Sequence, residues 1–205
     1  MPSVYQLKSK FQGLLRPISD ALFRAGITAN AVTVAAMVLS FVAGAALAYF
    51  RDRRLLLLLP AVLFLRMALN AVDGMLAREH NQKTALGAIL NELGDVISDA
   101  ALYLPLALIR PFEAVPMMLI VLLAILSEMT GVLGAQIGAS RRYDGPMGKS
   151  DRAFVFGALG LLLGVNLPIV AVVPYVLWIV LALLVLTVMN RAQGALAEIR
   201  GPVSR

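Results

Sequence analysis

The sequence contains no cysteine and a single histidine, His80. The absence of cysteine excludes disulfides, thiolate nucleophiles and cysteine metal sites. It also means that cysteine usage gives no indication of the redox compartment. Charged residues are also scarce at 15% of the chain, whereas hydrophobic residues make up 60% of its 205 positions. This balance is typical of a protein whose main solvent is the lipid bilayer rather than water.

A removable signal peptide is not expected, because no short apolar region with a small-residue cleavage site precedes the first long apolar run. The net charge of +6 could in principle serve nucleic acid. The basic residues stand mainly between apolar runs, however, where anionic lipid headgroups attract them. The sequence therefore predicts membrane lipids as their partners, and no nucleic acid.

Long apolar runs predict six transmembrane helices, since about 20 apolar residues cross the hydrocarbon as a helix. The first four spans lie approximately at residues 31–50, 55–77, 86–108 and 112–134. The stretch 153–190 has no charged residue and is too long for one span, so it predicts two short helices that reverse at Asn166-Leu167-Pro168. The predicted fold class is all-α and integral to the membrane, with a six-helix domain over residues 31–205.

Residues 1–30 predict a separate cytoplasmic segment ahead of the spans. Between residues 5 and 25, apolar side chains such as Leu15 and Leu22 recur at helical spacing among basic ones such as Arg16 and Arg24. This pattern is typical of an amphipathic helix in the membrane interface. A soluble helix without a packing partner is the less favoured alternative, because a long span follows at once.

The basic residues also predict the orientation. With six spans both termini share one side, and most lysines and arginines gather there, before the first span, in 78–83, in 141–152 and after the sixth span. The opposite side has only Arg51, Arg53, Arg54 and Arg110. By the positive-inside rule both termini face the cytoplasm. We therefore expect a multi-pass protein of the cell inner membrane with its site facing the cytoplasm.

Polar residues inside the predicted spans fall on two helix faces. Asn70 and Asp73 share one face of the second span, and Asn91 and Asp95 share one face of the third. Carboxylate and amide oxygens are the ligands that hard divalent cations prefer, and such cations bind phosphate oxygens. The pattern predicts a Mg²⁺ or Mn²⁺ site for a pyrophosphate near the cytoplasmic surface.

Arg66 lies deep in the second span, where a charge costs about 2.5–3.5 kcal/mol on insertion scales. An ion pair with Asp99 or Glu128 is favoured over a catalytic role for it. Glu79 and His80 follow the same span, and we expect them to be solvated loop residues rather than ligands.

The run at residues 70–78, N-A-V-D-G-M-L-A-R, followed at fixed spacing by Gly87, Asn91 and Asp95, resembles the signature of the CDP-alcohol phosphotransferase family. That signature reads D-x-x-D-G-x-x-A-R-x8-G-x-x-x-D-x-x-x-D. Every defined position matches except the first and third aspartates, which are Asn70 and Asn91 here. The family fold, six helices after an interfacial helix, would cover essentially the whole chain.

The resemblance implies a role for each matching residue. Metal would be bound by Asp73 together with Asn70, Asn91 and Asp95, although the two asparagines remove two negative charges. Asp95 would also be the base that deprotonates the acceptor hydroxyl. The cytidine nucleotide would be bound by Gly74, Ala77, Arg78 and Gly87, because small residues leave room and arginine offers a planar fork of donors.

Asn30 and Thr33 open the first span as in the family and would touch the nucleotide. Simple capping of that helix by Thr28 or Asn30 is an equally favoured alternative.

The acceptor would be bound by Lys149, Arg152 and Arg191, because family members place cations for an acceptor phosphate at these positions. For Arg141 and Arg142, in the loop before Lys149, lipid anchoring is favoured. Compensation for the missing metal charges is expected of Glu92, Asp99 or Glu128, provided that their side chains point inward.

The function implied by the resemblance is transfer of a phosphatidyl group from CDP-diacylglycerol or a similar CDP-alcohol to a small polar alcohol, with release of CMP, in phospholipid biosynthesis. The basic residues favour a phosphorylated polyol as the acceptor. Two alternatives stay open: a degenerate member that binds nucleotide or lipid without turnover, and a small transporter or scaffold that uses its intramembrane acids. A homodimer is expected from the resemblance alone.

Overall fold

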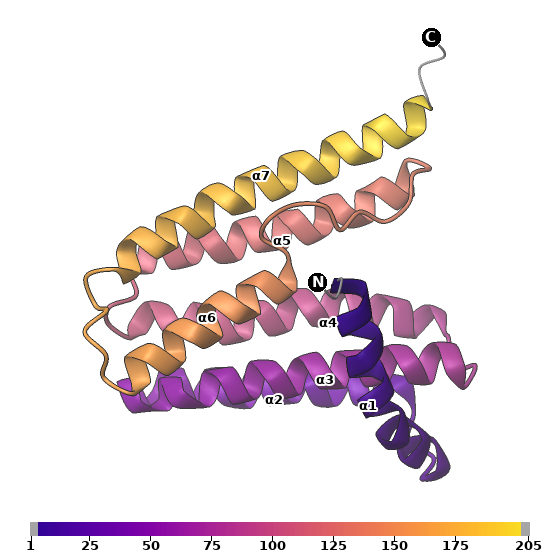
Figure 1. Cartoon of the computed structure of the whole chain (residues 1–205), viewed down its shortest axis with the longest axis horizontal. Coiled ribbons are helices and arrows are strands. Elements are labelled where there is room, and N and C mark those ends of the chain that lie inside the picture. The colour runs from indigo at the N-terminus through magenta and orange to yellow at the C-terminus, as the bar shows by residue number, and fades with distance from the viewer. Residues whose placement is uncertain (1–3, 202–205) are drawn as a thin grey trace.

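The computed structural model describes residues 4–201, and their side chains from residue 11 onward. This part of the chain is helical, with α1 at Val4–Arg24, α2 at Ala29–Phe50, α3 at Leu58–Glu79, α4 at Ala85–Tyr103, α5 at Ala114–Gln136, α6 at Lys149–Gly164 and α7 at Val173–Arg200. Short 3₁₀ segments follow α2 and α4, η1 at Arg53–Leu57 and η2 at Leu104–Leu108. The helices α2 to α7 form a bundle, and α1 runs across it (Figure 1).

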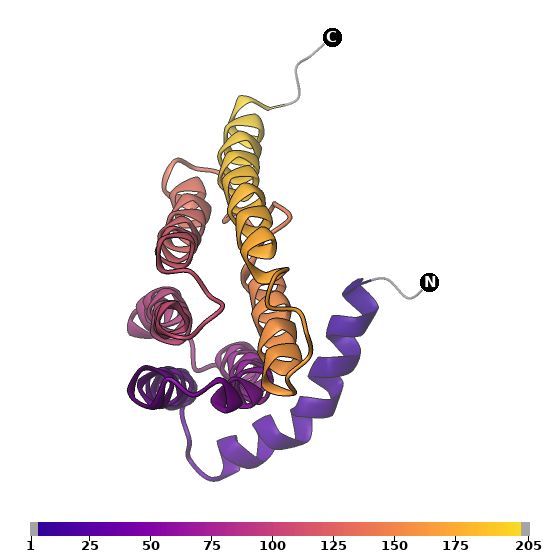
Figure 2. The ribbon, with the colours of Figure 1, turned by 90° about the vertical axis from the view of Figure 1, so that its left-hand side faces the viewer.

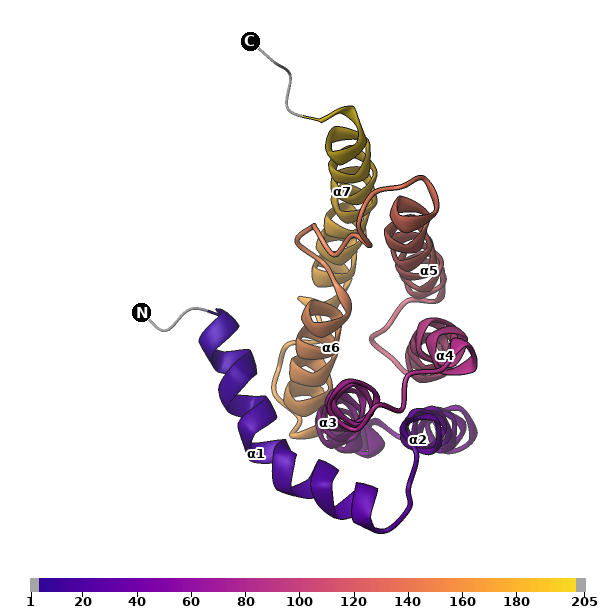
Figure 3. The ribbon, with the colours of Figure 1, turned by 90° about the vertical axis from the view of Figure 1, so that its right-hand side faces the viewer.

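The bundle consists of two rows of helices (Figures 2 and 3). One row holds α2, α4 and α5, and the other holds α3, α6 and α7. The rows touch at both ends, where α2 packs against α3 and α5 packs against α7. The larger of two apolar clusters of buried side chains draws on all six bundle helices. In the middle, α4 and α6 face each other through polar side chains, and this feature positions the site described below.

A helix lies at each of the six predicted spans, and four of them are long and apolar enough to cross a membrane: Ala29–Phe50, Arg53–Glu79, Ala114–Gln136 and Val173–Arg200. The other two differ for local reasons. α4 carries three carboxylates, at Glu92, Asp95 and Asp99, and α6 has only 16 residues. Six spans, and the orientation derived from them, therefore stay predictions.

Several predicted boundaries are shifted. The third predicted span ends as an α-helix at Tyr103, and Pro105 in the next turn has no N–H to continue the ladder. α6 begins at Lys149, before the predicted start at residue 153, because the Asp151 carboxylate accepts the Gly148 N–H at 2.9 Å and caps the helix. The predicted reversal lies between α6 and α7, where Asn166 has a φ of 61°.

The predicted helix at residues 5–25 is confirmed as a helix by α1, whose Pro17 lies inside it. Leu15 is buried and packs with α2 and α3 residues in a second apolar cluster. Side chains before residue 11 lie outside the described part, so the interfacial position of α1 stays a prediction.

Glu79 is exposed, as predicted, but it belongs to the last turn of α3 rather than to a loop, and together with His80 it contacts α1. Arg16 forms an ion pair with Glu79 at 3.1 Å. The His80 ring lies 3.1 Å from Asp20 and stacks on Phe23 at a centroid distance of 4.2 Å. Both residues therefore face α1 and lie outside the cavity that the motif lines.

The contact between α2 and α4 depends on Gly44. A Cβ at this position would lie 1.9 Å from the Ala101 carbonyl oxygen, which no relaxation of a side chain can relieve. We expect Gly44→Ala to destabilise the purified protein by about 1–3 kcal/mol, the usual cost of overpacking. Unfolding in detergent measures this. Gly13→Ala is the control, since a Cβ there meets nothing within 4 Å, and equal stability of the two variants would contradict the prediction.

Candidate active site

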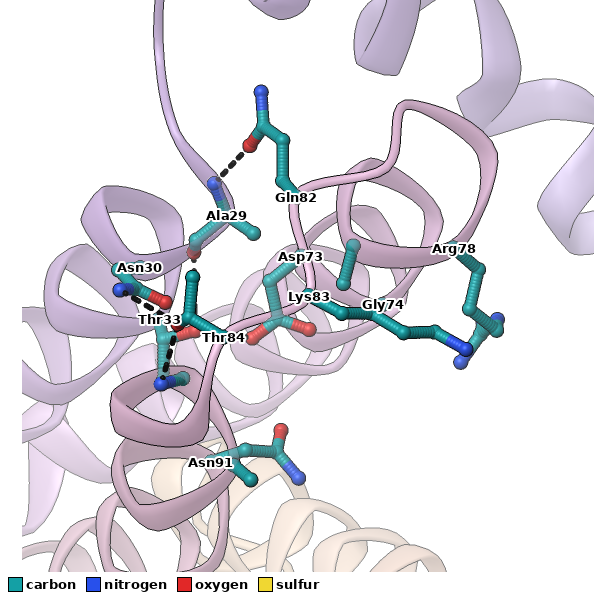
Figure 4. Close-up of a pocket in the computed structure, with 13 residues that line it drawn as sticks. Ala29, Asn30, Thr33, Asp73, Gly74, Arg78, Gln82, Lys83, Thr84 and Asn91 are labelled. Carbon is teal, nitrogen blue, oxygen red and sulfur yellow. Dashed lines mark hydrogen bonds between the residues drawn. The ribbon is translucent and has the colours of Figure 1, made fainter.

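A cavity of about 400 Å³ opens between the ends of α2, α3 and α4 (Figure 4). We call it the first cavity. It is lined by Ala29, Asn30, Thr33, Asp73, Gly74, Ala77, Arg78, Gln82, Lys83, Thr84, Gly87, Ala88 and Asn91. All the residues that the sequence assigns to the nucleotide lie in this wall, together with two of the four predicted metal ligands.

Asp73 is the buried acid of the first cavity, with 4% of its surface exposed. The Thr33 hydroxyl donates to Asp73 Oδ2 at 2.7 Å, which ties α2 to α3. Thr28 caps α2 by accepting the Ala31 N–H at 3.2 Å. Of the two residues considered as caps of this helix, Thr28 is therefore the cap. The Asn30 side chain lies in the cavity wall instead.

Gly74 of α3 and Gly87 of α4 both line the first cavity. A Cβ at Gly87 would lie 2.6 Å from Asn30 Oδ1 and 2.9 Å from Thr84 Oγ1, so a side chain there would collide with its neighbours. At Gly74, a Cβ would lie 3.1 Å from both terminal nitrogens of Arg78, whose guanidinium lies over this glycine. The glycines therefore set the shape of the cavity.

Sequence reasoning missed the three polar residues Gln82, Lys83 and Thr84 of the first cavity, together with Ala29 and Ala88. The chain turns back after α3 at Asn81, whose φ is 55°. Gln82 then accepts the Ala29 N–H at 2.6 Å, and Thr84 caps α4 by accepting the Gly87 N–H at 2.8 Å. The fixed spacing of eight residues between Arg78 and Gly87 could have indicated the three polar residues, because it requires the chain to follow one defined path from α3 back to α4.

Asn70 lines a different space, between α3 and α6, and binds Asp95 of α4. Asn70 Nδ2 donates to Asp95 Oδ1 at 3.1 Å, and the Lys149 ammonium contacts the same oxygen. A second cavity of about 220 Å³ lies here, lined by Leu63, Arg66, Met67, Asn70, Ala71, Lys149, Ser150 and Ala153. Of the four predicted metal ligands, Asp73 and Asn91 line the first cavity and Asn70 lines the second. Asp95 lines neither and contacts Asn70 and Lys149.

The donor set suits one hard cation better than two. Among the described residues, no group of three or more histidine, cysteine or carboxylate side chains could hold a metal ion. Asp73 and Asn91 line one cavity and offer a carboxylate and an amide oxygen, which fit a single divalent cation. Asp95 Oδ1 already accepts from an ammonium and an amide group, both of which compete with a metal.

Glu92, Asp99 and Glu128, the candidates for compensation of the missing metal charges, each pair with arginine inside the protein. Arg141 contacts Glu92, and Arg152 lies 2.7 Å from Asp99. The loop arginines Arg141 and Arg142, for which lipid anchoring is predicted, also form ion pairs within the protein. The Arg141 ion pair with Glu92 ties it to α4, and Arg142 pairs with Asp144 at 2.7 Å and with Glu198 at 2.7 Å.

Arg66 pairs with Asp99 as predicted, with Nη1 2.6 Å from Oδ1. This contact is electrostatic rather than a well-aligned hydrogen bond, since Asp99 Oδ1 has no hydrogen-bond donor. Arg152 and Arg191, which the resemblance assigns to the acceptor, are each 1% exposed. Lys149 is the more accessible of the three predicted acceptor residues, with 27% of its side chain exposed.

An apolar groove of about 490 Å³ continues from the second cavity along α3 and α6. It is lined by Pro60, Leu63, Phe64, Met67, Ser150, Ala153, Phe154, Gly157, Ala158 and Leu161. Four of these residues also line the second cavity, so the two spaces are continuous. A polar space that opens into an apolar groove has the shape of a site for an amphipathic molecule.

The sequence matches the CDP-alcohol phosphatidyltransferase family over residues 26–190, which include the complete motif and the lining of the first cavity. The chain belongs to this family. Within it, a relative from Escherichia coli strain K12, inner membrane protein YnbA, is 48% identical over 201 residues, which are 95% of this chain and 96% of YnbA.

Solved structures of Mycobacterium tuberculosis phosphatidylinositol phosphate synthase, PgsA1, share the fold. The structure with CDP-DAG bound has a TM-score of 0.73 at 21% identity and covers 92% of this chain and 96% of its own. The complex with manganese and citrate has a TM-score of 0.75 at 20% identity and covers 92% and 91%. The helical bundle described above is therefore the fold of a CDP-alcohol phosphatidyltransferase.

Arg78 and Lys83 are the two cations of the first cavity, and neither has a hydrogen-bond or ion-pair partner among the described residues. Figure 4 shows both side chains at the same side of the opening. We expect Lys83→Met to weaken CDP binding about tenfold, because a hydrogen bond to a charged group contributes about 1.5–3 kcal/mol. Equilibrium binding of CDP measures this. Lys83→Arg should retain affinity, and the exposed Arg54→Met is the control; unchanged binding in Lys83→Met would remove Lys83 from the site.

Proposed function

We propose that the chain transfers a phosphatidyl group from CDP-diacylglycerol, or a similar CDP-alcohol, to a hydroxyl of a small polar alcohol and releases CMP. The observation that carries this proposal is the first cavity, in which every residue assigned to the nucleotide surrounds the buried Asp73. Membership of the family and the CDP-DAG named in a PgsA1 structure support it.

The donor would bind across both spaces of the site. Its cytidine and diphosphate would occupy the first cavity, where Arg78 offers a fork of donors and Gly74, Ala77 and Gly87 leave room, with Asn30 and Thr33 in the α2 wall. Its acyl chains would follow the apolar groove between α3 and α6. Helix α3 lies between the first cavity and the groove, with Asp73 toward the first cavity and Asn70 toward the second. A donor that reaches from one to the other would therefore place its diphosphate close to Asp73 and Asn70.

Asp95 would act as the general base. Its carboxylate accepts the proton of the acceptor hydroxyl while that oxygen forms a bond to the lipid-side phosphorus of the donor. The bond from this phosphorus to the bridging oxygen breaks, and CMP leaves with that oxygen. Asn70 and Lys149 hold the carboxylate in place from α3 and α6.

A divalent cation, Mg²⁺ or Mn²⁺, would be held by Asp73 and Asn91, with Asp95 and Asn70 as neighbouring donors. When bound, it would neutralise diphosphate charge and so stabilise the leaving CMP. The manganese named in a PgsA1 structure supports a metal of this kind. A single cation is proposed, because only Asp73 contributes a carboxylate to the first cavity.

Restoring a carboxylate tests this metal site. We expect Asn91→Asp to tighten Mn²⁺ binding by roughly tenfold or more, because ligand charge is a main determinant of affinity for hard cations. Asn70→Asp should do less, since it removes the amide donor to Asp95 and places two carboxylates together. Titration of the purified protein with Mn²⁺ measures both. Asn166→Asp, at the far end of α6, is the control, and identical affinities in all variants would place the metal elsewhere.

The acceptor would approach Asp95 on the side of Lys149, Arg152 and Arg191. The resemblance favours a phosphorylated acceptor there, which requires these cations to be available. Arg152 and Arg191, however, are each paired with a buried carboxylate.

The direct test of the function is CMP release. Purified protein, radiolabelled CDP-diacylglycerol, Mg²⁺ or Mn²⁺ and a panel of small alcohols should yield CMP and a new lipid. Absence of CMP with every acceptor would reject turnover. CDP binding without turnover would then identify a degenerate member, the alternative that Asn70 and Asn91 favour.

We further propose a place in the inner membrane with both termini and the first cavity in the cytoplasm, and a homodimer. The name of YnbA supports the location, and the uneven distribution of lysine and arginine between the two sides supports the orientation. Crosslinking in native membranes tests the dimer, and accessibility of introduced cysteines at the termini tests the orientation.

A further inference from the structure

The interior cations on the acceptor side of the bundle are all paired with carboxylates. Five of them contact four acids: Lys149 with Asp95, Arg66 with Asp99, Arg152 with Asp99 and Glu128, Arg191 with Glu128, and Arg141 with Glu92 and Glu128. Five positive and four negative side chains leave a net charge of +1, which is spread over this network. No member of it is left without a carboxylate at hydrogen-bonding or ion-pair distance.

Arg152 uses its donors on partners inside the protein. Its Nε and Nη2 lie 3.2 Å and 2.7 Å from Asp99 Oδ2, and its Nη1 donates to the Met147 carbonyl at 3.2 Å. Nη2 also lies 3.4 Å from Glu128. With 1% of its surface exposed, this guanidinium is closed to a ligand as long as Asp99 and Glu128 keep their places.

Arg191 is committed in the same way. Its Nη1 donates to the Ser127 carbonyl at 2.6 Å and lies 3.2 Å from Glu128, and its Nε donates to the Asp144 carbonyl at 3.3 Å. The carbonyl partners come from α5 and from the loop before α6. Arg191 therefore joins three segments of the chain, and a ligand would have to break these contacts.

A phosphate monoester at this place would displace Asp99 or Glu128 from the arginines. These carboxylates are 4% and 9% exposed, so they would become buried charges without partners. Breaking one side of a buried ion pair costs about two to three powers of ten in an equilibrium constant. The arginines thus act as partners for Asp99 and Glu128 rather than as an anion site.

The second cavity offers uncharged hydrogen-bonding groups beside two cations, Arg66 and Lys149, that are already paired with carboxylates. Asn70 and Ser150 line it beside Lys149, whose ammonium is held by Asp95. Asn70 also donates to Asp95, so a hydroxyl in this cavity would lie next to the proposed base. Amide and hydroxyl groups can donate to and accept from several hydroxyls of one ligand.

We propose that the acceptor is an uncharged polyol that binds in the second cavity, and that Asp99 and Glu128 set this specificity by neutralising Arg66, Arg152 and Arg191. The proposal rests on the proposed function and reverses the expectation of a phosphorylated acceptor. Asp99 and Glu128 are positioning residues that exclude an anion and do not touch the substrate.

Matched acceptors test the specificity in the purified enzyme. Each uncharged polyol, such as glycerol or inositol, is compared with its phosphate monoester, and kcat/KM for CMP release is measured. We expect the uncharged member of each pair to be preferred by tenfold or more. Preference for the phosphorylated members would overturn the inference and leave the proposed transfer intact.

A binding measurement separates the inference from turnover. Inorganic phosphate is titrated into protein saturated with CDP, which fills the first cavity. The wild type should bind phosphate no better than millimolar, whereas Glu128→Gln should bind it about tenfold more tightly, because Arg191 and Arg152 lose a competing carboxylate. Glu113→Gln, an exposed position at the start of α5, is the control and should match the wild type.

Tight phosphate binding by the wild type would overturn the inference, even if no acceptor supports CMP release. Weak phosphate binding by the wild type supports the inference. This measurement requires no variant, so it remains a test even if Glu128→Gln fails to fold. A folded Glu128→Gln protein that gains neither phosphate affinity nor use of phosphorylated acceptors would also overturn it.

Discussion

Replacing Asp95 with asparagine should lower kcat for CMP release by about 10²–10⁴-fold, the usual contribution of a positioned general base. The amide keeps the size of the side chain but cannot take the proton of the acceptor hydroxyl. CDP binding should be nearly unchanged, because Asp95 does not line the first cavity. Steady-state kinetics and equilibrium CDP binding measure the two effects separately.

The same substitution also removes the carboxylate that Lys149 contacts. Loss of that ion pair predicts a modest loss of stability, so the unfolding transition of Asp95→Asn is measured beside its kinetics. Glu113→Gln is the control for a neutralised acid outside the site. Retention of kcat within a few fold of the wild type would place the base elsewhere and favour a role for Asp95 in holding Lys149.

The location of the first cavity was predictable from the sequence. Helical periodicity and the fixed spacing of the motif placed Asp73, Gly74 and Arg78 on one helix end and Gly87 and Asn91 on another. Two helices joined by a short turn must bring these ends together, so local rules sufficed. Thr33 was assigned from resemblance, and the structure adds the physical reason, its hydrogen bond to Asp73.

The pairing of the buried charges was only partly predictable. Arg66 had two candidate partners at helical spacing in other spans, and the structure selects Asp99 for the closest contact. The partners of Arg152 and Arg191 depend on how the two rows of helices face each other, which no local pattern encodes. The sequence therefore suggested that Arg152 and Arg191 form an anion site. In the tertiary structure these arginines pair with Asp99 and Glu128.

The two-row architecture explains why these charges are retained inside the bundle. The rows touch through apolar side chains at their ends, while α4 and α6 meet through Asp95–Lys149 and Asp99–Arg152 in the middle. Buried ion pairs contribute little net stability compared with apolar packing, but they require one relative position of the helices. The network thus fixes Asp95 relative to both cavities.

Replacing Arg152 with methionine should be among the most destabilising single changes outside the apolar core. Removing one partner of a buried ion pair costs about 3–5 kcal/mol, because the other charge is left buried. We expect the lower end of this range, since Asp99 keeps Arg66 and Glu128 keeps Arg191 as partners. Unfolding of the purified protein in detergent measures the loss, with the exposed Arg54→Met as control.

The double variant Arg152→Met with Asp99→Asn decides whether the loss arises from the uncompensated charge. Neutralising Asp99 removes that charge, so the double variant should be more stable than Arg152→Met alone, although Arg66 then loses its partner. If the two changes destabilise additively instead, packing of the long arginine side chain against α4 and α5 is the larger contribution. In that case packing, rather than the balance of charge between the rows, would hold α6 and its Lys149 next to Asp95.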